Sequence, residues 1–191
     1  MKTLILDTAS KYLYVSFLEN DNIIFSKFLE GKNNHSDNLL KVIEEGLNSL
    51  NMKVKDFNKI ILGIGPGSYT GLRVSVTVAK MFSWTLNIPL AIISSLDMLS
   101  SGYFNKDGIY AVTMIAKRNH VYGKLILVQN HEVTVLINDC FKEATEFLEM
   151  IKNYDYFLVN ESNYLIEPKN LKPWIVSDLH QLTPNYIQRE I

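Results

Sequence analysis

The 191-residue sequence contains a single cysteine, Cys140, so no disulfide bond can form within the chain. This usage is typical of a reducing compartment, and Cys140 beside Phe141 fits a small buried apolar residue better than a nucleophile. No run approaches the ~20 apolar residues that a membrane helix needs. The apolar start at residues 4–6 is interrupted by Asp7, too early for a signal peptide. We therefore expect a cytoplasmic protein.

The sequence also lacks an excess of charge of either sign. Its 19 basic and 20 acidic side chains give a net charge of −1, which provides no field to attract nucleic acid or an anionic membrane. The 47% hydrophobic and 20% charged residues are the proportions of an ordinary globular protein. The composition therefore does not predict binding of tRNA or DNA by this chain alone.

Histidine pairs with metal-binding spacing are absent as well. The four histidines are His35, His120, His131 and His180, and no two of them lie four residues apart. Neither H-E-x-x-H nor H-x-x-x-H therefore exists, and a zinc or iron hydrolase has no evident ligand set. We expect no catalytic metal and no cofactor, with His35 at the surface or at a helix start.

Apolar periodicity in the first half predicts strands followed by two helices. Short apolar runs predict the strands, and apolar residues at helical spacing predict the helices, the first of them capped by Ser36 or Asp37. In chain order we expect strands at 4–6, 12–18 and 23–28, a helix to about residue 50, a strand at 59–62, a helix at 72–88 and a strand at 90–93. The order is β-β-β-α-β-α-β.

The second half begins with the same order of elements. We expect strands at 109–115, 121–128 and 133–137, a helix at 141–151 and a strand at 156–159. Turn residues cluster between residues 100 and 108, which predicts a first lobe of residues 1–100 and a second, smaller lobe of residues 101–191. The predicted fold is α/β, a two-lobed actin-like (ASKHA, ribonuclease H-like) fold with duplicated β-β-β-α-β-α units and a reduced second lobe.

A glycine-rich loop joins the strand at 59–62 to the long helix. Glycines let such a turn expose N–H groups at a helix start; the loop residues are Gly65, Gly67, Ser68, Tyr69, Thr70 and Gly71. A phosphate-binding P-loop is excluded, because Leu72 and Arg73 follow Gly71 where lysine is required. The dinucleotide-binding motif fails at Ser68, and no nucleophile-elbow motif surrounds that serine. We expect Ser68 or Thr70 to cap the helix.

The helix at 72–88 is more apolar than a helix that covers one sheet face needs to be. Arg73, Lys80 and Asn87 form one narrow polar stripe, and apolar side chains occupy most of the remaining circumference. Two explanations remain open. Either the helix is sandwiched between other elements of the fold, or part of its surface is a protein–protein interface.

An actin-like kinase or ATPase is the alternative function. Such enzymes contact phosphate through a carboxylate-bearing hairpin in each lobe, and here Asp7, in residues 7–10, is placed to hold a hydrated Mg²⁺. The corresponding stretch of the second lobe, residues 115–119, has no carboxylate. Asp7 as a polar strand end is therefore favoured over a catalytic role.

Four stretches of the sequence resemble the TsaB family, also called YeaZ. They are L-I-L-D-T-A-S at residues 4–10, His35–Ser36 with the leucines at 39 and 40, G-P-G-S-Y-T-G-L-R at residues 65–73, and a P-x-Y-x-x-R pattern within residues 182–190. The resemblance extends over the whole chain, and the glycine-loop motif is highly specific. Family members usually carry D-A-R-x-x-E-V-Y in the second lobe, whereas Ile115 and His120 replace the acidic pair here.

The resemblance implies a non-catalytic scaffold role in forming threonylcarbamoyladenosine next to the anticodon of tRNA. The implied partner is the TsaD-type transferase, with a TsaE-type ATPase in the same complex, a homodimer in isolation, and tRNA reached only through the complex. First-lobe helices would form the contact. Its expected apolar centre is Leu39, Ile43, Leu72, Val76 and Ala79, with Arg73 and Lys80 at the rim. Val76→Glu is expected to abolish pairing and to leave the fold intact.

Overall fold

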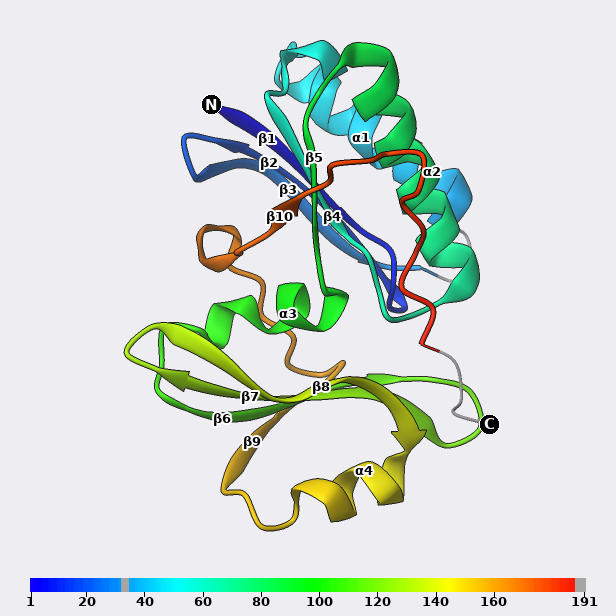
Figure 1. Ribbon diagram of the computed structural model, residues 1–191. Helices are drawn as coiled ribbons and strands as arrows, with labels where there is room; N and C mark the ends of the chain where they lie inside the picture. Colours follow the sequence, from blue (N-terminus) through cyan, green and yellow to red (C-terminus); the bar gives the residue numbers. More distant parts are fainter. Residues whose placement is uncertain (32–34, 188–191) are drawn as a thin grey trace. The chain divides into compact units, whose positions relative to one another are not determined.

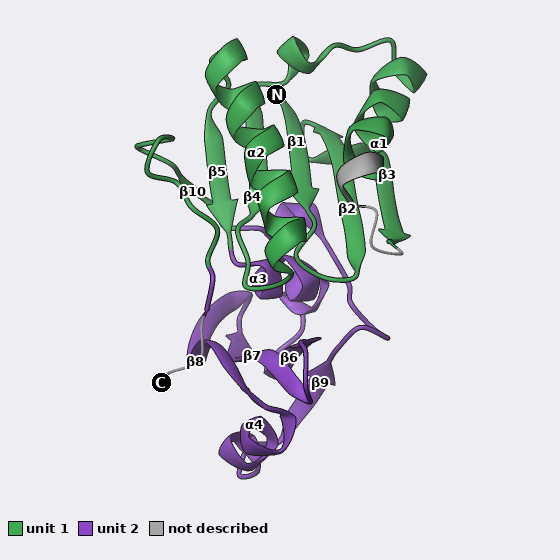
Figure 2. Ribbon diagram, turned by 90° about the vertical axis from the view of Figure 1, so that its right-hand side faces the viewer, with its two compact units in different colours: residues 1–93, 172–185 green, residues 94–171, 186–191 purple. Residues whose placement is uncertain are grey.

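The computed structural model describes residues 1–31 and 35–187, and the side chains of residues 35–37 lie outside that description. Figure 1 shows the fold coloured along the sequence. The chain divides into two compact units, drawn in green and purple in Figure 2. Unit 1 comprises residues 1–93 and 172–185, and unit 2 comprises residues 94–171 and 186–191. No helix among the described residues is long and apolar enough to cross a membrane.

Unit 1 contains a six-stranded sheet in the order β10-β5-β4-β1-β2-β3. The strands are β1 (Lys2–Asp7), β2 (Tyr12–Glu19), β3 (Asn22–Glu30), β4 (Lys59–Gly63), β5 (Leu90–Ile93) and β10 (Trp174–Ile175). β1, β4 and β5 run parallel, as strands linked by helical crossovers do, whereas β2 and β3 follow β1 as antiparallel hairpins. The sequence did not predict β10, which pairs with β5 through two residues only.

Two helices pack on this sheet (Figure 2). α1 (His35–Ser49) contacts β2 and β3, and α2 (Tyr69–Leu86) contacts β1, β4 and β5. Strand and helix side chains form one apolar core, which includes Leu4, Leu6, Val15, Phe17, Ile60 and Leu62. The predicted order β-β-β-α-β-α-β is confirmed. The side chains of Ser36 and Asp37, predicted to cap α1, lie outside the described residues.

Unit 2 repeats the beginning of this plan. Its sheet has the order β8-β7-β6-β9, which matches β3-β2-β1-β4 of unit 1, and β6 is parallel to β9 and antiparallel to β7. The elements are α3 (Ser95–Ser100), β6 (Gly108–Ile115), β7 (His120–Gln129), β8 (Glu132–Glu143), α4 (Ala144–Ile151) and β9 (Tyr156–Val159). This duplication confirms the predicted two-lobed actin-like fold.

The second copy is shorter than the first. After β9, the part of the chain that the structure describes contains no counterpart of α2 or β5, and residues 172–185 join unit 1 instead. The predicted lobes, residues 1–100 and 101–191, do not take account of the return of residues 172–185 to unit 1. The predicted helix start at residue 141 was wrong, because Phe141 and Lys142 still pair with Tyr122 and Val121 and α4 begins only at Ala144.

Candidate partner-binding face of helix α2

The glycine-rich loop leads from β4 into α2 and is bonded to the hairpin that follows β1. The Ser68 hydroxyl caps α2 by accepting a hydrogen bond from the Gly71 N–H at 3.3 Å, which confirms the predicted cap. The Ser68 N–H donates to the Ala9 carbonyl at 2.7 Å, and the Thr8 hydroxyl donates to the Gly71 carbonyl at 2.7 Å. The loop is therefore tied to its own fold.

Two glycines of the loop permit this close approach. A Cβ atom on Gly67 would lie 2.3 Å from the Ala9 carbonyl oxygen, and one on Gly71 would lie 2.0 Å from the Thr8 carbonyl oxygen. Both distances are far below contact, so no larger residue fits without displacing the backbone. The backbone of residues 8 and 9 thus lies against the start of α2, where a P-loop protein holds phosphate.

Asp7 ends β1 and is 1% exposed. Its Oδ1 accepts a hydrogen bond from the Ala9 N–H at 2.7 Å, an arrangement that shapes the turn into β2. Within residues 1–31 and 35–187, no group of three or more His, Cys, Asp or Glu side chains could hold a metal ion. The geometry therefore gives Asp7 a role in the turn.

The apolar residues predicted at the centre of the partner contact are core residues of unit 1. Leu39, Leu72 and Ala79 are fully buried, and Ile43 and Val76 are 2% and 5% exposed. A partner cannot reach these five side chains while the unit is folded, so the predicted centre of the contact is corrected. A helical projection shows which residues share an arc, but it does not show which apolar arc faces the sheet.

Both cations predicted at the rim make contacts within unit 1. The Lys80 ammonium donates to the carbonyls of His180 and Leu182, at 3.4 and 3.1 Å. Arg73 is exposed, and its guanidinium lies over the Tyr69 ring, 4.0 Å from the ring centroid. Arg73 thus lies at the surface of α2 beside Tyr69, and Lys80 holds the C-terminal part of unit 1.

Residues 176–185 form a strap beside α2 that the sequence did not predict (red in Figure 1). Its apolar side chains, from Val176, Leu179 and Leu182, pack against the core of unit 1. His180 meets the exposed Trp84 ring edge-on, with 5.4 Å between ring centroids. The strap and α1 both contact α2. Burial against these elements and the sheet explains most of the wide apolar arc of this helix.

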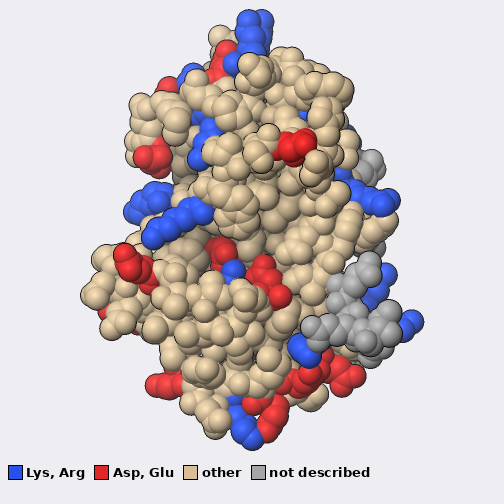
Figure 3. All heavy atoms as spheres, viewed as in Figure 1, with Lys and Arg blue, Asp and Glu red and all other residues tan. Residues whose placement is uncertain are grey.

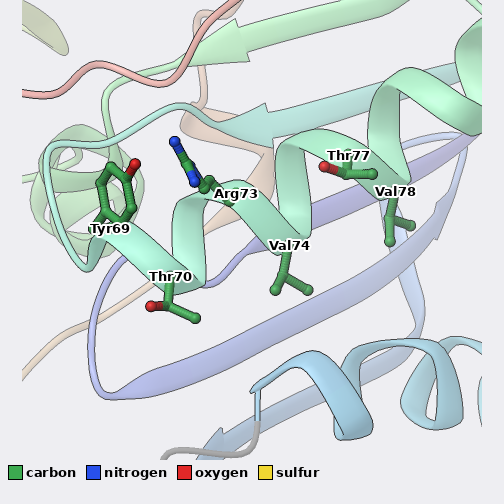
Figure 4. Close-up of a pocket in the computed structure, with 6 residues that line it drawn as sticks. All are labelled: Tyr69, Thr70, Arg73, Val74, Thr77 and Val78. Carbon is green, nitrogen blue, oxygen red and sulfur yellow. The ribbon is translucent and has the colours of Figure 1, made fainter.

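A row of exposed side chains nevertheless remains on α2. Its members recur at intervals of three and four residues, which aligns them along the helix: Tyr69, Arg73, Thr77, Met81 and Trp84. We name these five residues the α2 ridge. Trp84 is 71% exposed, Tyr69 55% and Met81 44%. A shallow hollow of about 430 Å³ adjoins the ridge and is lined by Tyr69, Thr70, Arg73, Val74, Thr77 and Val78 (Figure 4).

In unit 2, the residues that depart from the family pattern flank the turn between β6 and β7. Ile115 is exposed, whereas His120 is buried with its ring stacked on Phe141 at 4.7 Å. Cys140 is half-buried, and its thiol donates to the Gly123 carbonyl at 3.3 Å. Burial raises the pKa of that thiol, which lowers its thiolate content and fits the structural role expected for Cys140.

Unit 2 also contains a buried ionic cluster that the sequence did not reveal. Lys124 on β7 is 5% exposed, and its ammonium lies 2.7 Å from Asp97 of α3 and 3.2 Å from Asp139 of β8. Burial raises the pKa of the Asp97 carboxyl, and the attraction of Lys124 opposes that rise. The cluster links three elements that are separate in sequence, so no local motif marks it.

The fold and this geometry define a class: an actin-like protein whose glycine-rich loop is packed on its own backbone and whose α2 carries an exposed ridge. A family model described as "TsaD: tRNA N6-adenosine threonylcarbamoyltransferase" matches residues 29–185. A solved structure, described as an uncharacterized protein with similarity to peptidase YEAZ from Pseudomonas aeruginosa, superposes with a TM-score of 0.76 over 98% of this chain and 99% of that chain. At 17% identity, this likeness shows the fold.

Relatives in sequence specify the family. The chain is 34% identical over 155 residues to "tRNA threonylcarbamoyladenosine biosynthesis protein TsaB" of Bacillus subtilis. The matched residues make up 81% of this chain and 68% of that protein. The protein of the same name from Escherichia coli is 27% identical over 124 residues, with coverage of 64% and 53%. The chain belongs to the TsaB (YeaZ) family, and it spans about two thirds of the first relative and about half of the second.

Proposed function

We propose that this chain is a non-catalytic scaffold subunit that pairs with a TsaD-type transferase in forming threonylcarbamoyladenosine next to the anticodon of tRNA. Its relatives are named as biosynthesis proteins for this nucleoside. The α2 ridge is the observation that carries the proposal, because its large apolar side chains stay exposed on a helix that is otherwise well buried. Exposed apolar rows of this kind mark protein-binding surfaces.

The ridge would dock on a related helix of the transferase. The stretch that matches the TsaD family model, residues 29–185, includes both α1 and α2, so the two proteins offer similar helices to each other. Trp84 and Tyr69 supply the aromatic anchors that dominate many interfaces, and Arg73 supplies a cation beside them. From α1, Leu40 is 48% exposed and replaces its buried neighbour Leu39 as a contact residue.

The surroundings of the glycine-rich loop support a role without catalysis. The Ser68 N–H is bonded to Ala9, and the turn after β6 carries Lys117 and Arg118 but no carboxylate that corresponds to Asp7. In this proposal a TsaE-type ATPase joins the same complex, the chain forms a homodimer through the ridge when alone, and tRNA is contacted through the complex. Titration calorimetry with Mg-ATP tests the alternative, since saturable binding that Asp7→Asn removes would favour an ATPase or kinase.

Two tryptophan variants test the docking surface. Trp84→Ala removes an anchor of the ridge, and we expect its affinity for the TsaD-type transferase to fall by ~30-fold or more, which corresponds to ~2 kcal/mol. Trp174→Ala is the matched control, because Trp174 is 55% exposed on β10 and lies outside the ridge. Both variants should unfold at the temperature of the unaltered chain. Equal binding by the two variants would exclude the ridge, and no binding by the unaltered chain would exclude the partner.

A further inference from the structure

β9 forms an edge of the unit 2 sheet, although its counterpart in unit 1 is an interior strand. In unit 1, β4 is flanked on its outer side by β5 and then β10, and α2 provides the crossover from β4 to β5. In unit 2, the sheet ends at β9, because among the described residues no helix and strand corresponding to α2 and β5 follow it. The outer side of β9 therefore lacks the strand that its counterpart has.

The sequence of β9 carries neither the charge nor the proline that protect many edge strands, and its main protection is its length of four residues. Natural edge strands often carry lysine, proline or a bulge that prevents pairing with another chain. β9 is Tyr-Phe-Leu-Val, with no charge, proline or glycine. Phe157 is 51% exposed and Leu158 is 36% exposed, and successive strand residues point to opposite faces of a sheet. An added strand would therefore meet apolar side chains on both faces.

The neighbours of these two side chains would select the residues of an added strand. On one face, the centroid of the Phe157 ring lies 5.5 Å from that of the half-buried Tyr103 ring and 6.2 Å from that of the Tyr110 ring. On the other face, Leu158 is exposed beside a core that includes Ala111, its partner in the ladder with β6. Asn163 donates through Nδ2 to the Leu158 carbonyl at 3.0 Å and so marks the C-terminal limit of the edge.

Charge and area decide which molecule fits this edge. Residues 94–171 carry seven Lys or Arg and ten Asp or Glu, a net charge of −3. Figure 3 shows acidic side chains gathered over α4, the helix that packs on β7 and β8. Asp155 directly precedes β9. Nucleic acid would be repelled. A second copy would bring two acidic units together through strands of only four residues. So short a contact does not bury the ~1,200–2,000 Å² of a stable interface.

We propose that the outer edge of β9 binds an extended segment of a partner protein by strand addition, and that this segment has alternating apolar residues flanked by Lys or Arg. Main-chain hydrogen bonds to β9 provide affinity, and contacts with Phe157 and Leu158 provide specificity. Asp155, directly before β9, and Glu161, two residues after its end, attract the basic flanks. The site lies within unit 2 and is independent of the α2 ridge.

Two synthetic peptides test the proposal with the full chain. Both share an alternating valine–threonine core; one carries lysines at both ends, and the other carries glutamates. We expect the lysine-flanked peptide to bind at least ~10-fold more tightly by fluorescence anisotropy, equivalent to ~1.4 kcal/mol. In hydrogen exchange it should protect those amides of residues 156–158 that point away from β6. Phe157→Lys places a charge on the edge and should abolish binding, while the loss of its ring contacts with Tyr103 and Tyr110 should lower the unfolding temperature only slightly.

A matched variant lies on the opposite edge of the same sheet. Val135 on β8 is 42% exposed, and Val135→Lys should leave peptide binding unchanged. Equal affinity for the two peptides, binding of neither, or protection of β8 in place of β9 would overturn the proposal. So would a dimer or a tRNA complex that Phe157→Lys dissociates. Trp84→Ala should keep full peptide binding, so failure of this proposal is distinguishable from failure of the scaffold function.

Discussion

Thr8 lies directly against Gly71, through both its side chain and its backbone. The Thr8 hydroxyl donates to the Gly71 carbonyl at 2.7 Å, and a Cβ atom on Gly71 would lie 2.0 Å from the Thr8 carbonyl oxygen. The absence of a side chain at position 71 therefore allows the hairpin after β1 to rest on the first turn of α2. Since α2 carries the ridge, this contact fixes where the ridge lies on unit 1.

Replacement of that glycine should destabilise the protein. Gly71→Ala forces the hairpin and α2 apart, and overpacking of this kind costs ~1–3 kcal/mol of unfolding free energy. The exposed neighbour provides the control, because Thr70→Ala should change stability by less than ~0.5 kcal/mol. Urea denaturation followed by circular dichroism measures both. The same midpoint for Gly71→Ala and the unaltered chain would contradict the packing argument.

Adjacent residues of α2 should respond in opposite ways to the same new charge. Val76→Glu buries an unpaired carboxylate in the core of unit 1 and should cost more than ~4 kcal/mol, which corrects the earlier expectation of an intact fold. Thr77 is exposed on the ridge, so Thr77→Glu should keep the fold and weaken binding of the transferase. Thermal unfolding and calorimetry distinguish the two. Normal transferase binding by Thr77→Glu would argue against the ridge.

Lys80 should control how firmly the strap is held. Lys80→Met keeps the aliphatic stem but loses both hydrogen bonds to the carbonyls of His180 and Leu182. The bond to Leu182 is partly buried and worth ~1.5–3 kcal/mol, and the longer, exposed bond to His180 is worth less. We expect faster hydrogen exchange across residues 176–185, with little change in unit 2. Lys41→Met, on the exposed side of α1, is the control and should leave the strap unchanged. Unaltered exchange in Lys80→Met would show that the apolar strap residues suffice.

Asp97 should make stability fall as pH rises. Burial raises the pKa of its carboxyl above the ordinary 3.8, so the folded state keeps a proton that the unfolded state has already released. The contribution of Asp97 to stability therefore declines from about pH 3.8 upward, through its raised pKa. Asp97→Asn cannot titrate, so its unfolding free energy should decline less over this range. Identical slopes for Asp97→Asn and the unaltered chain would refute the assignment.

Local patterns in the sequence were enough to predict the order of elements. Alternating apolar runs and helical spacing depend on near neighbours, and they predicted both copies of β-β-β-α-β and the cap at Ser68. The start of α4 was predicted wrongly, because Phe141 and Lys142 belong to a strand that pairs with β7. This pairing exists only in the folded sheet, so it leaves no local pattern. Similarly, β10 is two residues long and has no pattern of its own.

The candidate contact residues could not be assigned from periodicity. Leu39 and Leu40 are adjacent and equally apolar, yet the first is fully buried and the second is 48% exposed, because only the fold determines which side faces the sheet. Lys80 looked like a rim residue because the strap that binds it comes from a distant part of the sequence. Trp84, the most exposed of the large apolar side chains, belonged to the apolar arc and gave no separate signal.

The return of residues 172–185 to unit 1 also determines the order in which the protein can be completed. The ribosome synthesises the chain from the N-terminus at ~5–20 residues per second, so all of residues 94–171 emerge before β10 and the strap. Residues 94–171, the main part of unit 2, are thus an insertion that is complete while unit 1 still lacks its final strand. Until the last residues are made, the flank of α2 at Lys80 and Trp84 has no strap beside it, and a nascent chain exposes more of this helix than the finished protein does.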